Sequence, residues 1–311
     1  MSLAFVFPGQ GSQSVGMLNA LADAYSQVLD TFAEASDALG RDLWKLAASG
    51  PAEALNQTEN TQPAMLAAGV AVWRVWRARG GALPVVMAGH SLGEYSALVC
   101  ANALDFADAV RLVADRARFM QEAVPVGEGG MAAILGLDDA ATQRLCDAAA
   151  QGEVLAPVNF NSPSQVVVAG SAGAVARAVA QAKQAGAKRA ILLPVSGPFH
   201  SSLMQPAAER MAERLRQVQI RSPEIPVLHN VHVQAETEPD AIRDVLVRQL
   251  ASPVRWVETI EKMAAEGVGL VIECGPGKVL VGLNKRITRA VDALPMFDAD
   301  TVEAALQAVA D

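Results

Sequence analysis

The pentapeptide GHSLG at residues 89–93 places a serine between two glycines, directly after an apolar run and directly before a helical pattern. This G-x-S-x-G spacing is typical of a sharp strand-to-helix turn that exposes the serine hydroxyl and leaves room for a substrate. The first amides of such a helix, including that of Leu92, point toward the same place and can stabilise an oxyanion. We therefore expect Ser91 to be a nucleophile. The plain alternative is that Ser91 is only a turn residue.

A serine nucleophile needs a base, and the sequence offers only four histidines. His200 lies in SGPFHS at 196–201, where an inserted unit is expected to end and the main domain to resume. That junction lies on the rim of the expected cleft, so we predict His200 to be the base. A loop histidine that only bonds the backbone is the alternative.

The other three histidines are weaker candidates for the base. His90 is adjacent to Ser91 in sequence, and the side chains of such neighbours usually point apart. We predict the apolar run IPVLHNVHV at 225–233 to be a strand, so that His229 and His232 would lie on opposite faces. We expect these two histidines to have a structural role or to lie at the surface.

A hydrolase triad would require an acid between the serine and the histidine, at the end of a strand. The acids in that interval include Asp138 and Asp139, which are typical of the solvated start of a helix. Since no good third acid is found, we expect a Ser-His dyad whose imidazole is oriented by an uncharged group.

A glycine-rich turn, FPGQGSQ at 7–13, follows the first apolar strand. It lacks the third glycine of a dinucleotide fingerprint, because residue 14 is serine, and we exclude a nicotinamide site. Such a turn can present a backbone amide to a carbonyl oxygen, and the amide of Gln10 is the candidate. With Leu92 it would form a two-donor oxyanion hole. The segment GPGK at 275–278 lacks the second half of a phosphate-binding loop and is predicted to be a tight turn.

Arg116 stands out on a helix predicted over 105–121. The apolar stripe of this helix consists of Phe106, Ala109, Val110, Val113, Ala117 and Met120. Arg111 and Arg118 fall opposite the stripe, whereas Arg116 falls at its edge, where a charge needs a partner. That partner is either a structural carboxylate or the carboxylate of a substrate, for which a guanidinium offers a bidentate fork.

The elements that must position these residues alternate between strand and helix, which is typical of an α/β fold with parallel strands. Residues 128–196 follow a different order, β-α-β-β-α-β, which is ferredoxin-like. We therefore predict an α/β-hydrolase-like domain, discontinuous over 1–127 and 197–311, with a small ferredoxin-like α+β domain inserted at 128–196. The run GLVIECG at 269–275 is predicted to be the last strand, followed by one closing helix.

Composition excludes several classes of function. The formal net charge is -8 and the 25 Lys and Arg residues form no basic run, so nucleic acid is a poor partner. Three widely spaced cysteines, in apolar surroundings, favour neither disulfides nor a metal site and fit a reducing cytoplasm. The N-terminal apolar run stops at Pro8, so these signals indicate neither export nor a membrane span.

Taken together, these segments resemble the malonyl-CoA:acyl carrier protein transacylase family from the first strand to the last helix. The segments that carry the resemblance are GQGSQ (9–13), GHSLGE (89–94), Arg116, NFNSP (159–163), GPFHS (197–201), RQLASPVRW (248–256) and GPGKVL (275–280). The resemblance implies that Ser91 carries the malonyl group as an ester and that His200 is its base. It implies that Arg116 binds the free malonyl carboxylate.

The resemblance also implies supporting roles at four further positions. The amides of Gln10 and Leu92 would form the oxyanion hole, and the backbone carbonyl of Gln249 would orient the imidazole. Phe199 is similar to the residue of malonyl-selective relatives rather than of those that accept a methylmalonyl unit. The expected reaction is ping-pong transfer for fatty acid synthesis, without cofactor or metal.

The expected partner, acyl carrier protein, is acidic, so docking requires a local basic patch. Two pairs are candidates: Lys188 with Arg189, and Lys285 with Arg286. Other function classes stay open. One is a serine thioesterase or esterase, which would require a third acid, and another is a scaffold without turnover. A third is an acyltransferase that serves polyketide synthesis or malonate decarboxylation.

Overall fold

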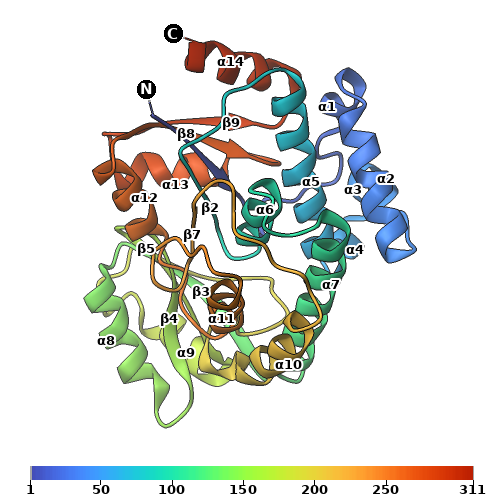
Figure 1. The fold of residues 1–311 in the computed structure, drawn as a ribbon. Coiled ribbons are helices and arrows are strands. Elements are labelled where there is room, and N and C mark those ends of the chain that lie inside the picture. The colour runs from blue at the N-terminus through green and yellow to red at the C-terminus, as the bar shows by residue number, and fades with distance from the viewer. Residues whose placement is uncertain (1, 311) are drawn as a thin grey trace.

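The computed structural model describes residues 2–310, which form two separate β-sheets with their helices (Figure 1). All neighbouring strands of the larger sheet are parallel. In spatial order they are β7 (Val227–Leu228), β2 (Val86–Gly89), β1 (Ser2–Phe7), β8 (Val268–Cys274) and β9 (Asp292–Met296). The carboxyl ends of β1 and β2, where the glycine-rich turn and the G-x-S-x-G segment follow, are therefore neighbours.

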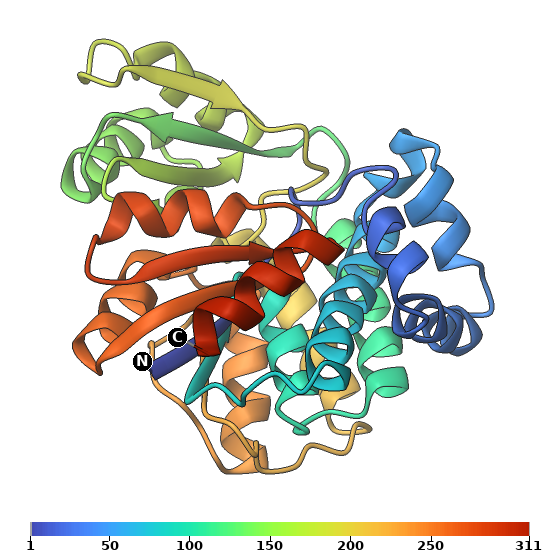
Figure 2. The same cartoon turned by 90° about the horizontal axis from the view of Figure 1, so that it is seen from above.

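Strand β1 lies in the middle of this sheet and is buried on both faces, because its side chains alternate between two hydrophobic cores. Leu3, Phe5 and Phe7 belong to the larger core, whereas Ala4 and Val6 belong to the second. The second core is covered by α12 (Trp256–Ala265) and α13 (Val279–Ile287). Helices thus cover both faces of the parallel sheet (Figure 2).

The larger core receives side chains from most of the remaining helices. These are α1 (Asn19–Ala24), α2 (Gln27–Leu39), α3 (Leu43–Ser49), α4 (Ala52–Leu55), α5 (Thr58–Ala78), α6 (Gly93–Cys100), α7 (Phe106–Glu122), the short 3₁₀ turn η1 (Ser202–Met204), α10 (Gln205–Leu215), α11 (Pro239–Gln249) and α14 (Ala299–Ala310). Helix α7 begins where the sequence predicts, because the side chain of Asp105 caps its first turn.

The second sheet is antiparallel, in the order β4-β5-β3-β6. Its elements along the chain are β3 (Gly129–Leu135), α8 (Asp139–Ala150), β4 (Leu155–Ser162), β5 (Gln165–Ser171), α9 (Ala172–Gln181) and β6 (Arg189–Leu192). One face packs against α8 and α9, and the other contributes Met131 and Val167 to the larger core. The predicted combination of a parallel sheet and a separate antiparallel unit is confirmed.

Two predictions about secondary structure are wrong. Only Val227–Leu228 of the run 225–233 is a strand, because the chain turns at residues 230–232 and cannot continue the ladder. After β8 the chain forms α13, then β9, then α14, rather than one closing helix. Strand β9 contains Pro295, which is tolerated because β9 is the edge strand of the sheet.

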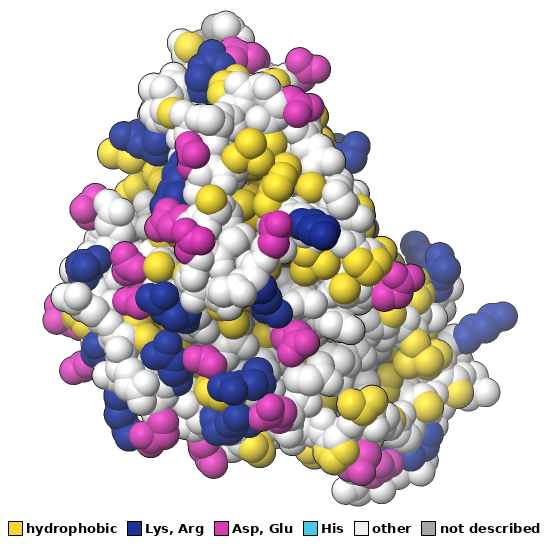
Figure 3. Space-filling view, turned by 90° about the vertical axis from the view of Figure 1, so that its right-hand side faces the viewer, with side chains coloured by type: hydrophobic (Ala, Val, Ile, Leu, Met, Phe, Trp, Pro, Cys, Tyr) yellow, Lys and Arg dark blue, Asp and Glu magenta, His cyan; other side chains and the backbone are white. Residues whose placement is uncertain are grey.

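The surface carries charges of both signs. On the face of Figure 3, Lys and Arg side chains are interspersed with Asp and Glu, and hydrophobic side chains lie among them. No helix within residues 2–310 is both long enough and apolar enough to cross a membrane.

Candidate active site

Ser91 lies at the sharp turn between β2 and α6. Its φ of 51° is in the left-handed region, which a non-glycine residue adopts only where the surroundings hold it. A Cβ atom at Gly89 would lie 1.8 Å from the backbone carbon of Gly93, and one at Gly93 would lie 2.0 Å from the carbonyl oxygen of Phe7. Both glycines of the pentapeptide are therefore required by the close approach of α6 to the ends of β1 and β2.

His200 contacts the serine directly. Its Nε2 lies 2.7 Å from Ser91 Oγ, and its Nδ1 lies 2.9 Å from the carbonyl oxygen of Gln249. Because a carbonyl oxygen only accepts, Nδ1 carries the proton and Nε2 presents its lone pair to the hydroxyl. The group that orients the imidazole is thus uncharged, as the sequence predicts.

The imidazole is held in its neutral form. Burial is the main cause that lowers the pKa of His200 to about 3, and the positive charge of Arg116 lowers it further. At neutral pH His200 is therefore an acceptor rather than a cation. It can take a proton from the Ser91 hydroxyl when the reaction begins.

Arg116 is almost completely buried, with 1% of its surface exposed. Its Nη1 donates to Gln62 Oε1 at 2.8 Å, and its Nη2 donates to Gln249 Oε1 at 3.0 Å and to Ser91 Oγ at 3.1 Å. Burial lowers the pKa of Arg116, but a guanidinium remains charged at neutral pH. Within residues 2–310 no carboxylate pairs with this charge, so the site is ready to bind an anion.

The other arginines of α7 are arranged as the sequence predicts. Arg111 and Arg118 are exposed and pair with Asp108 and Asp115 on the same helix. Arg116 is the arginine on the inner edge of the stripe, and the structural carboxylate considered for it is not found among the described residues.

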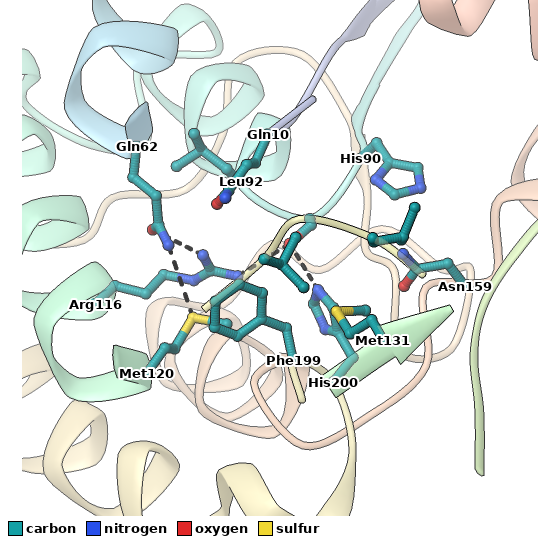
Figure 4. Close-up of a pocket in the computed structure, with 13 residues that line it drawn as sticks. Gln10, Gln62, His90, Leu92, Arg116, Met120, Met131, Asn159, Phe199 and His200 are labelled. Atoms are coloured by element: carbon teal, nitrogen blue, oxygen red, sulfur yellow. Dashed lines mark hydrogen bonds between the residues drawn. The ribbon is translucent and has the colours of Figure 1, made fainter. Parts of the chain in front are cut away.

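A pocket of about 100 Å³ brings the predicted site residues together, except Gln249, which lies behind His200 and Arg116 (Figure 4). Its polar lining contains Gln10, Ser91, Arg116 and His200. Its apolar lining consists of Leu92, Met120, Met131, Leu193, Val195 and Phe199. Met131 comes from β3 and Leu193 and Val195 follow β6, so the pocket lies between the two sheets. Its size suits a short acyl group.

Gln10 and Leu92 approach the pocket from neighbouring strands. Gln10 follows β1 and Leu92 follows β2, and the two strands pair in the register Phe7–Gly89. The amide of Leu92 lies at the amino end of α6, where helix amides point outward. The side chain of Gln10 donates from Nε2 to Thr58 Oγ1 at 3.4 Å. The group of Gln10 that remains for an oxyanion hole is therefore its backbone N–H.

The four basic residues considered for docking lie outside the pocket. Lys188, Arg189, Lys285 and Arg286 are all exposed, and none of them lines the cavity beside Ser91. Any role they have concerns a partner's surface rather than the acyl group.

The prediction for the H-x-x-H pair is wrong in its geometry. The rings of His229 and His232 lie 6.1 Å apart and nearly perpendicular, because the segment turns instead of continuing as a strand. His229 is fully buried, and its Nδ1 lies 2.7 Å from Glu94 Oε1, so the structural role expected for it fits.

Three polar residues that the sequence does not indicate as functional contact the site. They are Gln62, which accepts from Arg116, Asn161, whose Oδ1 lies 2.8 Å from His90 Nε2, and Asn230, which accepts the backbone N–H of Ser91. The only sequence signal is polarity next to apolar runs, as in TENTQ at 58–62, which does not by itself distinguish a buried amide from an exposed one.

The described residues contain no group of three or more His, Cys, Asp or Glu side chains arranged to hold a metal ion. The three cysteines are free and buried. Burial raises the pKa of Cys146 to about 12 and raises that of the other two thiols, so none of them is an activated nucleophile.

Comparison with known proteins agrees with this arrangement. The family model described as "Acyl transferase domain" matches residues 4–302. The malonyl CoA-acyl carrier protein transacylase of Escherichia coli K12 is 59% identical over 304 residues, which cover 98% of each chain. The transacylase of the same description from Coxiella burnetii superposes with a TM-score of 0.97 at 52% identity, over 99% of this chain and 97% of that one.

A further solved structure, described as a type II PKS acyl-carrier protein in complex with its malonyl-transacylase, matches with a TM-score of 0.98 at 54% identity, over 99% of this chain and 100% of that one. These matches extend over nearly the whole chain and include both sheets. The chain is an acyltransferase and belongs to the malonyl CoA-acyl carrier protein transacylase family.

Proposed function

We propose that the protein transfers the malonyl group from malonyl-CoA to the phosphopantetheine thiol of acyl carrier protein and so supplies malonyl units for fatty acid synthesis. The observation that carries this proposal is the position of Arg116. A buried guanidinium, which has no carboxylate partner within residues 2–310, lies 3.1 Å from the hydroxyl of a serine that is paired with a neutral histidine. That combination fits an acyl group with a free carboxylate at its far end.

In the first half-reaction, Ser91 Oγ gives its proton to His200 Nε2 and attacks the thioester carbonyl carbon. The C–O bond forms and the carbonyl π electrons move to oxygen, where the Leu92 and Gln10 amides donate to the oxyanion. When the tetrahedral intermediate collapses, the C–S bond breaks and the CoA sulfur takes the proton from the imidazolium. The products are free CoA and a malonyl ester of Ser91.

In the second half-reaction, the phosphopantetheine thiol gives its proton to His200 and attacks the ester carbonyl. The same two amides stabilise the oxyanion, the C–Oγ bond breaks, and the imidazolium returns the proton to Ser91 Oγ. CoA leaves before the carrier protein reacts, so the proposed kinetics are ping-pong.

The acyl group is held at both ends in this scheme. Arg116 donates to the malonyl carboxylate in this proposal, and the ester end is fixed at Ser91. Phe199 is 7% exposed and lines the pocket together with Met120 and Met131. We assign Phe199 to the wall that limits branching of the acyl chain.

Gln249 has two roles in the proposed site. Its backbone carbonyl fixes the protonated Nδ1 of His200. Its side chain accepts from Arg116 and donates through Nε2 to the carbonyl oxygen of Ser91 at 3.1 Å. One residue thus aligns the base, the carboxylate-binding group and the nucleophile.

The domain division proposed here keeps the boundaries expected from the sequence. A hydrolase-like catalytic domain comprises 1–127 and 197–311, and a ferredoxin-like domain comprises 128–196. The order β4-β5-β3-β6, with two helices on one face, supports the ferredoxin-like assignment. We assign the reaction to the cytoplasm, which fits three free thiols.

For the carrier protein we assign docking to the basic pairs Lys188–Arg189 and Lys285–Arg286. All four side chains are exposed, and α13, which carries the second pair, contacts β4 of the antiparallel sheet. The second pair therefore lies beside the junction of the two sheets, where the phosphopantetheine arm must enter, whereas Lys188 and Arg189 lie at the start of β6, on the opposite edge of the antiparallel sheet.

The experiment that tests this function is intact-mass analysis after mixing the protein with malonyl-CoA or acetyl-CoA, followed by addition of phosphopantetheinylated carrier protein. We expect a malonyl adduct that forms on the wild type, is absent from Ser91→Ala and moves to the carrier. Loss of the adduct to free malonate would indicate a thioesterase, and no adduct would indicate a scaffold. Carrier proteins of fatty acid and polyketide systems, offered in competition, separate the two pathways.

A further inference from the structure

The loop that follows β7 holds the serine turn through the side chain of Asn230. Its Oδ1 accepts the backbone N–H of Ser91 at 2.8 Å, and its Nδ2 donates to the carbonyl oxygen of Gly89 at 2.7 Å. Asn230 is fully buried, so water does not compete for these bonds. One primary amide therefore pairs with both peptide groups that flank His90.

This pairing continues the β2–β7 ladder past the end of β7. The two strands pair at Met87–Val227 and Ala88–Leu228, and β7 then stops. The Asn230 side chain supplies the acceptor and the donor that the backbone of a longer strand would otherwise supply. The end of β2 is thus held in line with the sheet although its neighbour has turned away.

The backbone of Ser91 needs such support. The left-handed region is unfavourable for a non-glycine residue, and Ser91 has a φ of 51°. The bond from the Ser91 amide fixes the peptide plane that sets this φ. The direction of the Ser91 hydroxyl toward His200 follows from that plane.

Asn230 is itself anchored by a buried carboxylate. Glu94 Oε2 accepts the backbone N–H of Asn230 at 2.9 Å, and Glu94 Oε1 lies 2.7 Å from Nδ1 of His229. Glu94 lies in the first turn of α6, directly after the serine turn. The helix that follows the nucleophile therefore fixes the residue that holds the nucleophile.

We propose that Asn230 is a positioning residue for acyl transfer, which holds Ser91 in its left-handed conformation and keeps the Ser91 amide out of the oxyanion hole. The inference rests on the proposed function in that it takes Ser91 as the nucleophile. Because the Ser91 N–H is already donated to Asn230, the developing oxyanion is left to the amides of Leu92 and Gln10.

The test compares Asn230→Ala with Asn284→Ala as a matched control. Asn284 is also a buried asparagine that accepts a hydrogen bond, from Trp256 Nε1 at 3.0 Å, but it does not line the pocket. The readout is the rate of malonyl-adduct formation on Ser91, measured against malonyl-CoA concentration. For Asn230→Ala we expect the maximal rate to fall about thirtyfold or more with the half-saturating concentration within about threefold. For Asn284→Ala we expect a rate within about twofold of the wild type after correction for folded fraction.

Asn230→Asp adds a signature that a purely structural role would not give. A protonated aspartic acid reproduces the donor and the acceptor of asparagine, whereas the ionised form turns a negative charge toward the carbonyl of Gly89. We expect the rate of Asn230→Asp relative to the wild type to rise about tenfold as the pH falls from about 8 to about 6. If Asn230→Ala does not fold, the pH dependence of Asn230→Asp still shows whether Asn230 positions Ser91.

The proposal is overturned if folded Asn230→Ala forms the adduct as fast as Asn284→Ala. It is also overturned if the rate of adduct formation by Asn230→Asp, divided by that of the wild type, does not change with pH. A wild-type protein that forms no adduct at all would instead contradict the proposed function, so the two failures are distinguishable.

Discussion

The guanidinium of Arg116 donates a hydrogen bond to the hydroxyl of Ser91, with Nη2 3.1 Å from Oγ. The same hydroxyl lies 2.7 Å from Nε2 of His200, so the serine oxygen is held between a cation and a neutral base. A positive charge in this place stabilises a developing alkoxide and also lowers the basicity of the imidazole. Binding of an anion by Arg116 therefore changes the chemistry of both neighbours.

Removal of the Arg116 guanidinium changes the preference between acyl groups. For Arg116→Ala we expect the kcat/KM for malonyl-CoA to fall about a hundredfold or more, since truncation of one partner of a buried charge pair costs several kcal/mol. Acetyl transfer depends less on this charge, so the ratio of acetyl to malonyl transfer rises. Arg118→Ala, an exposed arginine of the same helix, is the control. An unchanged preference in Arg116→Ala would refute the assignment of Arg116 to the carboxylate.

The depressed pKa of His200 predicts an unusual pH dependence. In the proposed mechanism the neutral imidazole is the active form, and with a pKa of about 3 it stays neutral far below pH 6.5. The rate of Ser91 modification by an uncharged sulfonyl fluoride is therefore expected to be flat between about pH 5 and pH 8 once hydroxide reactivity is subtracted. An imidazole with its ordinary pKa of about 6.5 would lose about thirtyfold over the acidic part of that range. Such a loss would contradict the buried, charge-perturbed state of His200.

Gln249→Ala separates the two roles of that residue, because alanine keeps the backbone carbonyl. We expect the reaction of Ser91 with the sulfonyl fluoride to stay within about threefold of the wild type, since His200 is still oriented. The kcat/KM for malonyl-CoA is expected to fall about tenfold, because Arg116 loses an acceptor that fixes it. Equal losses in the two assays would show that the side chain acts through the base rather than through the arginine.

Charge reversal at Arg286 tests the docking surface. With Arg286→Glu we expect formation of the malonyl ester from malonyl-CoA to be unchanged, because Arg286 is exposed and outside the pocket. The KM for carrier protein is expected to rise about tenfold, and its dependence on salt to weaken. Arg216→Glu, an exposed arginine of a different surface segment, is the control. An unchanged KM would remove Arg286 from the docking site.

The sequence predicts the parts of the site that depend on local pattern. The serine turn follows from its glycines, the buried edge position of Arg116 follows from helical periodicity, and the position of His200 follows from the end of the inserted unit. The structure brings these three side chains into one pocket. Their proposed roles await the experiments above.

The contacts that the sequence does not predict come from segments far apart along the chain. Asn230 and Gln62 are polar residues whose burial depends on how the segment after β7 and helix α5 pack against the serine turn. This packing cannot be predicted from a single sequence. The sequence predicts strand through the turn at 230–232 because β-branched Val231 and Val233 continue the apolar pattern of Val227 and Leu228. The sequence does not indicate strand β9, because Pro295 weakens the strand pattern.

The groups proposed for catalysis and one side of the pocket wall are carried by different parts of the molecule. Ser91, Gln10 and Leu92 follow strands of the parallel sheet, whereas Met131, Leu193 and Val195 belong to or follow strands of the antiparallel sheet. Mutations in the second group can reshape the space for the acyl chain while the reacting atoms keep their places. Substitutions in the antiparallel sheet therefore offer a route to new acyl preferences that leaves the ends of β1 and β2 untouched.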